Sequence, residues 1–370
     1  MLFLALGIAA QVYLCHRLRF RPAVTQLLVV AALLVFIFSN VDWFPKLHHF
    51  LHRHVWGGRS FESIGPFFTM WCWVLPPVAV VFLLRDHVHR REFRPERRAF
   101  LTASAAVIAA APTIALGAGF IIRKDFQVKE MDLKFPNLPR DLQGLRLVQL
   151  SDIHIGDFFT ASDVSRVVDA ANNLRADIVF VTGDLISTKW DPLDRCLLEL
   201  SRLKSSAGIW GCLGNHEQHQ KIEAYTTRKA LEFDIRFLRQ QSVPLQFGQS
   251  KINLVGVDHQ RHDRPYLEGA QQLVAPGQFN LLLSHNPDVF PVAARQGFDL
   301  TLAGHTHGGQ INLPLGGANL NIADLVTPYT KGFYKLPNSS LYVNCGLGTI
   351  GVPVRLGAPP EITVIRLCNS

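Results

Sequence analysis

Two histidines lie two residues apart among glycines in the segment Leu-Ala-Gly-His-Thr-His-Gly-Gly-Gln, which spans residues 302–310. The imidazole nitrogens of His305 and His307 are common ligands of transition metals. The glycines on either side remove side-chain bulk, and they let the backbone turn tightly around the two rings. One such pair is weak evidence for a metal site, so the interpretation depends on which other ligand types the chain could bring beside it.

Residue types that bind metals also follow four other apolar runs of the sequence. The five polar segments are Ser151-Asp152-Ile153-His154, Gly183-Asp184, Gly214-Asn215-His216-Glu217, Ser284-His285-Asn286 and Gly304-His305-Thr306-His307. The carboxyl ends of neighbouring strands meet at one edge of an open α/β sheet, which is where such sheets bind ligands. Imidazole, carboxylate and amide ligands together suit Mn, Fe, Zn or Co better than Ca, which prefers oxygen atoms. The sequence therefore predicts a transition-metal site at this edge, with Asp152 and His154 turned to the same side by the alternation of a strand.

The strands that must position these residues are predicted by apolar runs rich in Val, Ile and Leu. Eight runs recur, at 145–150, 178–182, 209–213, 252–257, 279–283, 300–303, 341–345 and 362–367. Nearly continuous apolar strands are typical of sheets that are covered on both faces. Helical patterns fall between several of the runs, at 160–175, 191–204 and 221–239. Strands that first alternate with helices and then follow one another more closely predict a layered α/β domain with two packed sheets.

The five motifs, in this order, resemble those of the calcineurin-like metallophosphoesterase superfamily over about residues 145–310. The segments 346–355 and 360–362 near the C-terminus are similar to a bacterial membrane-associated branch, which includes proteins called transmembrane protein with metallophosphoesterase domain. The resemblance implies that residues 145–370 fold as a four-layer αββα sandwich. It also implies a metal-dependent phosphoesterase that hydrolyses phosphodiester, phosphomonoester or pyrophosphate bonds.

The resemblance further implies a centre with two divalent metal ions. One ion would be held by Asp152, His154, Asp184 and His307, and the other by Asp184, Asn215, His285 and His305, so that Asp184 bridges the pair. A hydroxide between the ions would attack phosphorus. His216, which is not a ligand in the family, would protonate the leaving group as general acid. Glu217 stands where many relatives have Asp, which leaves its contact to His216 open.

The positive charge of the chain is concentrated in its first third. Residues 1–125 carry 14 Lys and Arg and 6 Asp and Glu, whereas residues 126–370 carry 23 of each kind, so the whole net charge of +8 lies before residue 126. A basic excess that alternates with apolar runs indicates membrane topology. The balanced charge of the remaining residues gives no sign of a surface that binds nucleic acid.

Four apolar runs, at roughly 2–16, 23–39, 67–84 and 99–122, predict an N-terminal membrane region of about four transmembrane helices, since a span needs about 20 residues. The first run is short and contains Gln11, so it is the weakest of the four. The predicted domains are a transmembrane region over 1–122, a connector over 123–144 and the catalytic domain after it. Arginine-rich loops at 16–22 and 85–98 predict a multi-pass protein of the bacterial inner membrane, with its catalytic domain on the extracytoplasmic side.

These expectations favour a membrane-anchored phosphoesterase that acts on a lipid-linked or envelope phosphate ester, with the lipid bilayer as its partner. Similar enzymes cleave the pyrophosphate of UDP-2,3-diacylglucosamine in lipid A synthesis, and that alternative requires a cytoplasmic catalytic domain. A non-catalytic metal-binding membrane scaffold is a further alternative, although a scaffold would have no need of a proton donor such as His216. The substrate, the metal and the oligomeric state stay open at the level of the sequence.

Overall fold

The computed structural model describes residues 2–17, 75–76, 78–80, 82–83, 114–261, 265–315 and 318–370. The chain divides into two compact units. One consists of Met1–Ile121 with Gly351–Val354, and the other consists of Ile122–Ile350 with Arg355–Ser370. The five polar segments predicted to bind metal all belong to the second unit.

The predicted membrane region of four helices is not supported. No helix among the described residues is both long and apolar enough to cross a membrane. The first apolar run forms α1 (Leu2–Arg17), whose 16 residues fall short of the roughly 20 that a spanning helix needs. The run at 23–39, most of 67–84 and the first part of 99–122 lie outside the described residues.

The predicted location in the bacterial inner membrane depends on those four helices and is not supported either. A multi-pass protein of the inner membrane, with its catalytic domain on the extracytoplasmic side, requires the four spans and the arginines between them. Because the described residues contain no helix of spanning length, that prediction is wrong. The prediction failed for a physical reason, because an apolar run indicates hydropathy but does not determine the length of a helix.

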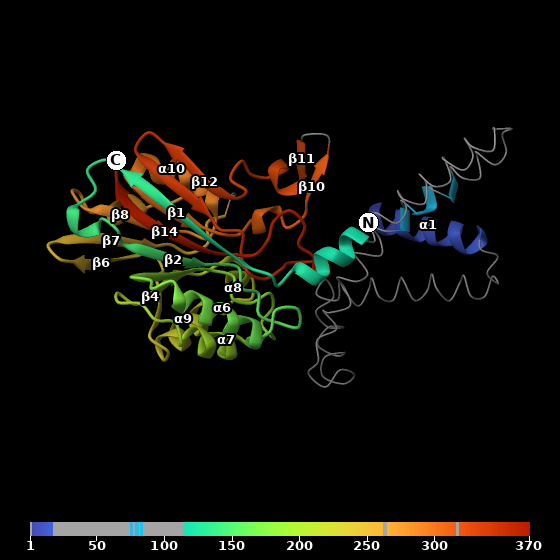
Figure 1. Cartoon of the computed structure of the whole chain (residues 1–370), viewed down its shortest axis with the longest axis horizontal. Coiled ribbons are helices and arrows are strands. Elements are labelled where there is room, and N and C mark those ends of the chain that lie inside the picture. Colours follow the sequence, from blue (N-terminus) through green and yellow to red (C-terminus); the bar gives the residue numbers. More distant parts are fainter. Residues whose placement is uncertain are drawn as a thin grey trace. The chain divides into compact units, whose positions relative to one another are not determined.

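The described part of the second unit is built on two six-stranded sheets (Figure 1). The first has the order β1-β14-β2-β3-β4-β5, made of Gln127–Phe135, Glu361–Asn369, Arg146–Leu150, Ile178–Thr182, Ile209–Cys212 and Ile235–Phe237. The second has the order β12-β13-β9-β8-β7-β6, made of Gly332–Leu336, Ser339–Val343, Leu300–Ala303, Phe279–Leu283, Ser250–Gly256 and Gln241–Phe247. A separate hairpin joins β10 (Asn312–Leu315) to β11 (Ala318–Asn321).

The strands that carry the predicted site pair in parallel. In the first sheet β2 pairs with β3 and β3 with β4, and in the second sheet β7 pairs with β8 and β8 with β9. Parallel neighbours need a crossover connection, and α6 (Ala161–Asn173), α7 (Leu193–Leu200) and α10 (Phe290–Gln296) supply three of them. The carboxyl ends of β2, β3 and β4 therefore lie at one edge of the first sheet, and those of β7, β8 and β9 lie at one edge of the second.

Buried side chains hold four layers together. Leu147 of β2 packs with Leu281 and Leu302 in the core between the two sheets, whereas its neighbour Val148 packs with Val164 of α6. This alternation follows from the period of two along a strand, which sends successive side chains to opposite faces. A third buried cluster joins β7 and β8 to α10 on the other face of the second sheet. The layers are helix, sheet, sheet and helix, so the predicted αββα sandwich is correct.

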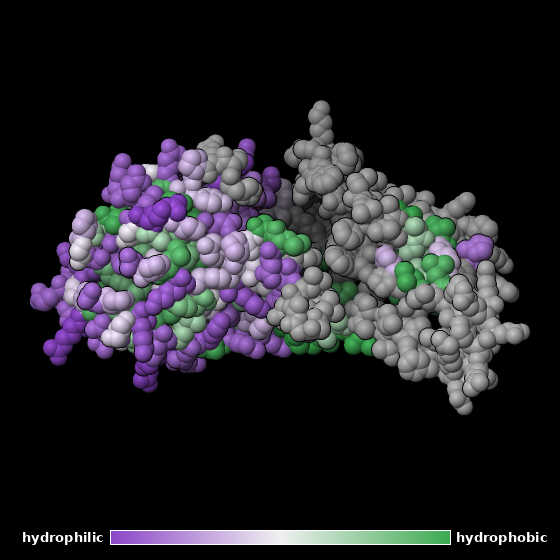
Figure 2. Space-filling model, turned by 90° about the horizontal axis from the view of Figure 1, so that it is seen from above, coloured by the Kyte–Doolittle hydropathy of each residue, from purple (hydrophilic) through white to green (hydrophobic). Residues whose placement is uncertain are grey.

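The remaining helices cover the face of the first sheet that turns away from the second. They are α7, α8 (Asn215–His219) and α9 (Glu223–Leu231), which Figure 1 shows beside α6. Figure 2 shows a mostly hydrophilic surface over the described residues of this unit, with apolar side chains in small patches. β1 and a short 3-10 helix, η3 (Arg140–Leu142), lie within residues 123–144, the predicted connector. The domain boundaries at 122 and 144 stay a prediction.

The N-terminus of α6 yields a test of stability. The buried carboxylate of Asp163 accepts hydrogen bonds from the backbone N–H of Thr160 at 2.8 Å and from Nζ of Lys124 at 2.6 Å. Burial alone would raise the pKa of Asp163, but these hydrogen bonds hold it below its usual value. We expect Asp163→Ala to lower the free energy of unfolding at pH 7 by about 1–2 kcal/mol, measured by urea denaturation.

The pH dependence and a control sharpen this test. A lowered pKa stabilises the fold above the pKa of the unfolded carboxyl, about 3.9, so the difference between wild type and variant should shrink below about pH 4. Asp169→Ala removes an exposed carboxylate of the same helix and should change stability by less than about 0.5 kcal/mol. Equal effects of the two substitutions would contradict the capping role of Asp163.

Candidate metal centre

The predicted ligands lie in sharp turns that follow the strands. Five of the seven, Asp152, His154, Asp184, His305 and His307, have positive φ angles between 44° and 75°. A residue other than glycine in this left-handed region costs on the order of 1 kcal/mol or more, and such strain clusters at functional sites. The sequence predicted that strand alternation would turn Asp152 and His154 to the same side, and this prediction is wrong. They lie beyond the end of β2 and are directed by the turn.

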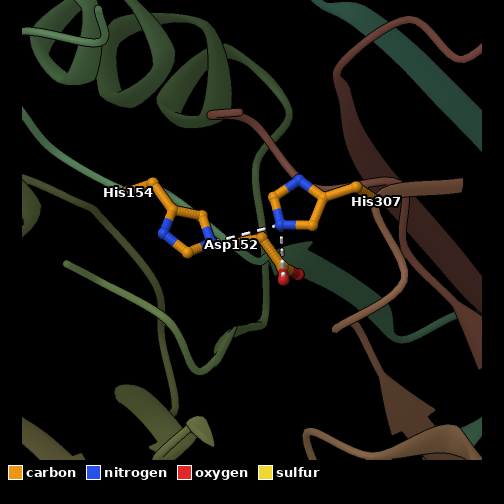
Figure 3. A group of neighbouring side chains, drawn as sticks. All are labelled: Asp152, His154 and His307. Atoms are coloured by element: carbon orange, nitrogen blue, oxygen red, sulfur yellow. Dashed lines mark hydrogen bonds and ion pairs between the residues drawn. The ribbon is translucent and has the colours of Figure 1, made fainter. Parts of the chain in front are cut away.

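A first group of side chains consists of Asp152, His154 and His307, all of them buried (Figure 3). Nε2 of His307 lies 3.1 Å from Nε2 of His154 and 3.3 Å from Oδ1 of Asp152. The three residues come from two sheets, because Asp152 and His154 follow β2 of the first sheet and His307 follows β9 of the second. The two sheet edges therefore meet at this point.

A second group consists of Asp184, His285 and His305, and a third joins His154, Asp184 and His216. Nε2 of His285 lies 3.0 Å from Oδ2 of Asp184, and Nε2 of His154 lies 3.7 Å from the same oxygen. Within each of the three groups the potential ligand atoms lie within 4.8 Å of one another. The structure thus brings together six of the predicted ligands. Asp184 lies between His154 of the first group and His285 of the second.

The seventh predicted ligand, Asn215, begins α8 directly beside the cluster. The backbone N–H of the next residue, His216, donates to Oδ1 of Asp184 at 2.9 Å. Oδ1 of Asn215 is buried and has no hydrogen-bond partner among the described residues. An unpaired buried polar atom costs about 1–3 kcal/mol, and coordination of a cation would remove that cost. The side chains present therefore fit divalent metal ions.

The charges of the cluster point to the same conclusion. Burial raises the pKa of Asp152 to about 6. Burial alone would lower the pKa of His285, but the carboxylates of Asp184 and Asp152 raise it to about 10. Burial lowers the pKa of His154 to about 3, so this ring is neutral and keeps a lone pair for a metal. The two carboxylates attract positive charge to a place where the neighbouring imidazoles can act as ligands.

The sequence left open whether Glu217 contacts His216, and the structure gives Glu217 other partners. Its buried carboxylate accepts hydrogen bonds from the backbone N–H groups of Asp184 at 3.0 Å, Leu185 at 2.8 Å and Gly214 at 2.8 Å. It therefore joins the turn after β3 to the turn after β4. His216 instead has Ser187 as a partner, because its Nδ1 lies 2.8 Å from the Ser187 carbonyl oxygen.

The loop after β3 supports two histidines of the site, and no sequence motif marks it. Oγ of Ser187 lies 2.9 Å from Nδ1 of His154, in addition to the contact of its carbonyl oxygen with His216. The backbone N–H of Ser187 donates to Asp191 at 2.7 Å, which closes the turn. If Nε2 of His154 binds a metal, its Nδ1 carries the proton, and the oxygen of the Ser187 hydroxyl is placed to accept a hydrogen bond from this N–H.

Other close contacts lock the turns that carry the ligands. The backbone N–H of His305 donates to Asp152 at 3.0 Å, and a Cβ atom added to Gly304 would collide with the same carboxylate. Glycine is therefore required at residue 304 by close approach. The fully buried guanidinium of Arg355 donates to the carbonyl oxygens of His307 and Cys345. It thereby anchors the turn of His307 to the segment that precedes β14.

The Ser187 hydroxyl offers a test that does not depend on turnover. We expect Ser187→Ala to weaken the binding of Mn²⁺ by about 10- to 100-fold, measured by isothermal titration calorimetry, because ring orientation at His154 is lost. Ser187→Thr keeps a hydroxyl and should restore most of the affinity. Ser201→Ala, which removes an exposed hydroxyl remote from the ligands, serves as the control. Unchanged Mn²⁺ affinity in Ser187→Ala would rule out this supporting role.

Comparison with known proteins agrees with this geometry. A family model described as calcineurin-like phosphoesterase matches residues 145–309. The uncharacterized metallophosphoesterase YkuE of Bacillus subtilis is 31% identical over 287 residues, which cover 74% of this chain and 98% of YkuE. The transmembrane protein with metallophosphoesterase domain of Bos taurus is 29% identical over 256 residues, which cover 65% of this chain and 56% of that protein.

A solved structure of a dimetal phosphatase from Danio rerio is 12% identical, with a TM-score of 0.32, and the match covers 55% of this chain and 88% of that one. The uncharacterized metallophosphoesterase Cj0846 of Campylobacter jejuni is 31% identical, and the match covers 65% of this chain and 63% of that relative.

The near-complete match to YkuE and the family motifs in the cluster of predicted ligands establish the family. The chain belongs to the calcineurin-like metallophosphoesterases and is a metal-dependent phosphoesterase.

Proposed function

We propose that the chain hydrolyses phosphate esters with the help of two divalent metal ions, held by the seven residues predicted from the motifs. The observation that supports this most directly is the position of Asp184. Its carboxylate lies 3.0 Å from Nε2 of His285 in one ligand group and 3.7 Å from Nε2 of His154 at the other. A carboxylate between two sets of imidazoles is suited to bridge a pair of cations.

The ligands divide into two sets around Asp184. The first set is Asp152, His154 and His307, and the second is Asn215, His285 and His305. Imidazole, carboxylate and amide donors favour Mn, Fe, Zn or Co. Such ions, when bound, lower the pKa of water and stabilise negative charge on phosphoryl oxygens. The chain itself holds the donors rigidly, through the strained turns and the hydrogen bonds of Glu217.

His216 is the proposed general acid. A carbonyl oxygen only accepts hydrogen bonds, so the contact with the Ser187 carbonyl keeps the proton of the ring on Nδ1. When the ring is doubly protonated, its Nε2–H is the proton available for the oxygen of the leaving group. The ring lies edge-on to His154, with the ring centres 4.8 Å apart, and is only partly buried. It is therefore beside the ligands and still within reach of a substrate.

The proposed substrate is a phosphate ester that is not a nucleic acid, because residues 126–370 carry equal numbers of basic and acidic side chains. The preference for a lipid-linked ester depended on the predicted membrane spans and is not part of this proposal. A non-catalytic scaffold is disfavoured, since it would not need an oriented imidazole next to the ligands.

Removal of the shared carboxylate tests the metal pair. We expect wild-type protein loaded with Mn²⁺ to retain two ions per chain, measured by inductively coupled plasma mass spectrometry, and Asp184→Asn to retain fewer. Hydrolysis of bis-p-nitrophenyl phosphate by Asp184→Asn should fall by at least about 100-fold in kcat/KM. Asp194→Asn is a matched control, because its exposed carboxylate contacts Tyr225 away from the ligands. A variant that keeps both ions and full activity would refute the assignment of Asp184.

The role of His216 is tested by the leaving group. We expect His216→Gln to keep its metal content and to lose about 10²- to 10⁴-fold in kcat toward an alkyl phosphodiester, whose alkoxide must be protonated as it leaves. The loss should be much smaller with bis-p-nitrophenyl phosphate, because p-nitrophenolate leaves without a proton. An equal loss with both substrates would show that His216 does not act as a general acid.

A further inference from the structure

One histidine beside the metal cluster is neither a predicted ligand nor the proposed general acid. His259 follows β7, and the second sheet pairs β7 with β8 and β8 with β9. The carboxyl ends of these three strands therefore deliver His259, His285 and His305 to the same edge of the sheet. The ring centre of His259 lies 5.3 Å from that of His305 and 5.9 Å from that of His285.

The backbone on both sides of His259 is held in place. Asp258 accepts two hydrogen bonds from the guanidinium of Arg239, at 2.8 and 3.0 Å. The carbonyl oxygen of Gln260 accepts a hydrogen bond from Nδ2 of Asn286 at 2.7 Å. The imidazole between these anchors is partly buried, and its Nδ1 is buried without a hydrogen-bond partner in the described part of the chain. The fold thus fixes the backbone that carries the ring and leaves Nδ1 of the ring without a hydrogen-bond partner among the described residues.

His259 lies next to the second ligand set without belonging to it. His285 and His305 form a compact group with Asp184 in which the ligand atoms are within 4.8 Å of one another, and His259 is not a member of that group or of the other two found among the described residues. A ligand oxygen atom bound beside His285 and His305 would lie next to the ring of His259. In a phosphoesterase, a phosphoryl oxygen of the bound substrate would be such an atom.

We propose that His259 is a substrate-binding residue, whose ring hydrogen-bonds a phosphoryl oxygen of the ester next to His285 and His305. This inference rests on the proposed function, since it needs a phosphate ester at the metal cluster. It adds a residue outside the five motifs, and it assigns that residue to the affinity for phosphate and not to the retention of metal.

The test compares two variants of the full chain that differ in their ability to form hydrogen bonds. His259→Phe keeps a ring of similar size without nitrogen, and His259→Gln keeps a polar group at a similar distance from the backbone. The probe is inorganic phosphate, titrated into Mn²⁺-loaded protein and followed by isothermal titration calorimetry. Metal content is measured on the same samples by mass spectrometry, and thermal unfolding checks that each variant is folded.

We expect His259→Phe to raise the Kd for phosphate by about tenfold or more, with wild-type metal content, and His259→Gln to recover part of that loss. A phosphate Kd within about twofold of wild type in His259→Phe would overturn the inference. Loss of metal from this variant would also overturn it, because His259 would then be a ligand. A wild-type protein that binds no metal would refute the proposed function itself, and the inference with it.

Discussion

Two buried carboxylates, Asp152 and Asp184, lie where the edges of the two sheets meet, and the surrounding structure compensates their charge. Buried anions are costly unless they are paired or coordinate a cation. Backbone N–H groups of His305 and His216 donate to them, and His285 lies between them with its pKa raised to about 10. This demand for positive charge, surrounded by imidazoles and one amide, is the physical basis of a metal-dependent phosphoesterase.

The αββα sandwich makes this arrangement stable. Five of the predicted ligands adopt left-handed backbone conformations, which persist only where the surroundings leave no alternative. Those surroundings include the core between the sheets, the hydrogen bonds that two turns donate to the Glu217 carboxylate, and the buried guanidinium of Arg355, which donates to the His307 carbonyl oxygen. Rigid placement matters for catalysis, because donors that are already in position need no reorganisation when charge develops.

The proximity of the five polar motifs could be predicted from the sequence because each follows an apolar strand, and strand ends collect at a sheet edge. β1 and β6 do not form apolar runs in the sequence, since most of their side chains are exposed. Ser187 and His259 could not be predicted, because a single serine or histidine in a loop has no distinguishing sequence pattern and acquires its neighbours only in three dimensions. The predicted membrane helices have no counterpart among the described residues, because an apolar run indicates hydropathy and not the length of a helix.

The most direct test of a shared metal pair is diffraction from crystals of the Mn²⁺-loaded protein, recorded at the manganese absorption edge. We expect two anomalous peaks, one beside Asp152, His154 and His307 and the other beside Asn215, His285 and His305, with the Asp184 carboxylate between them. A single peak, or peaks remote from these side chains, would contradict a shared pair of cations as the centre of this protein.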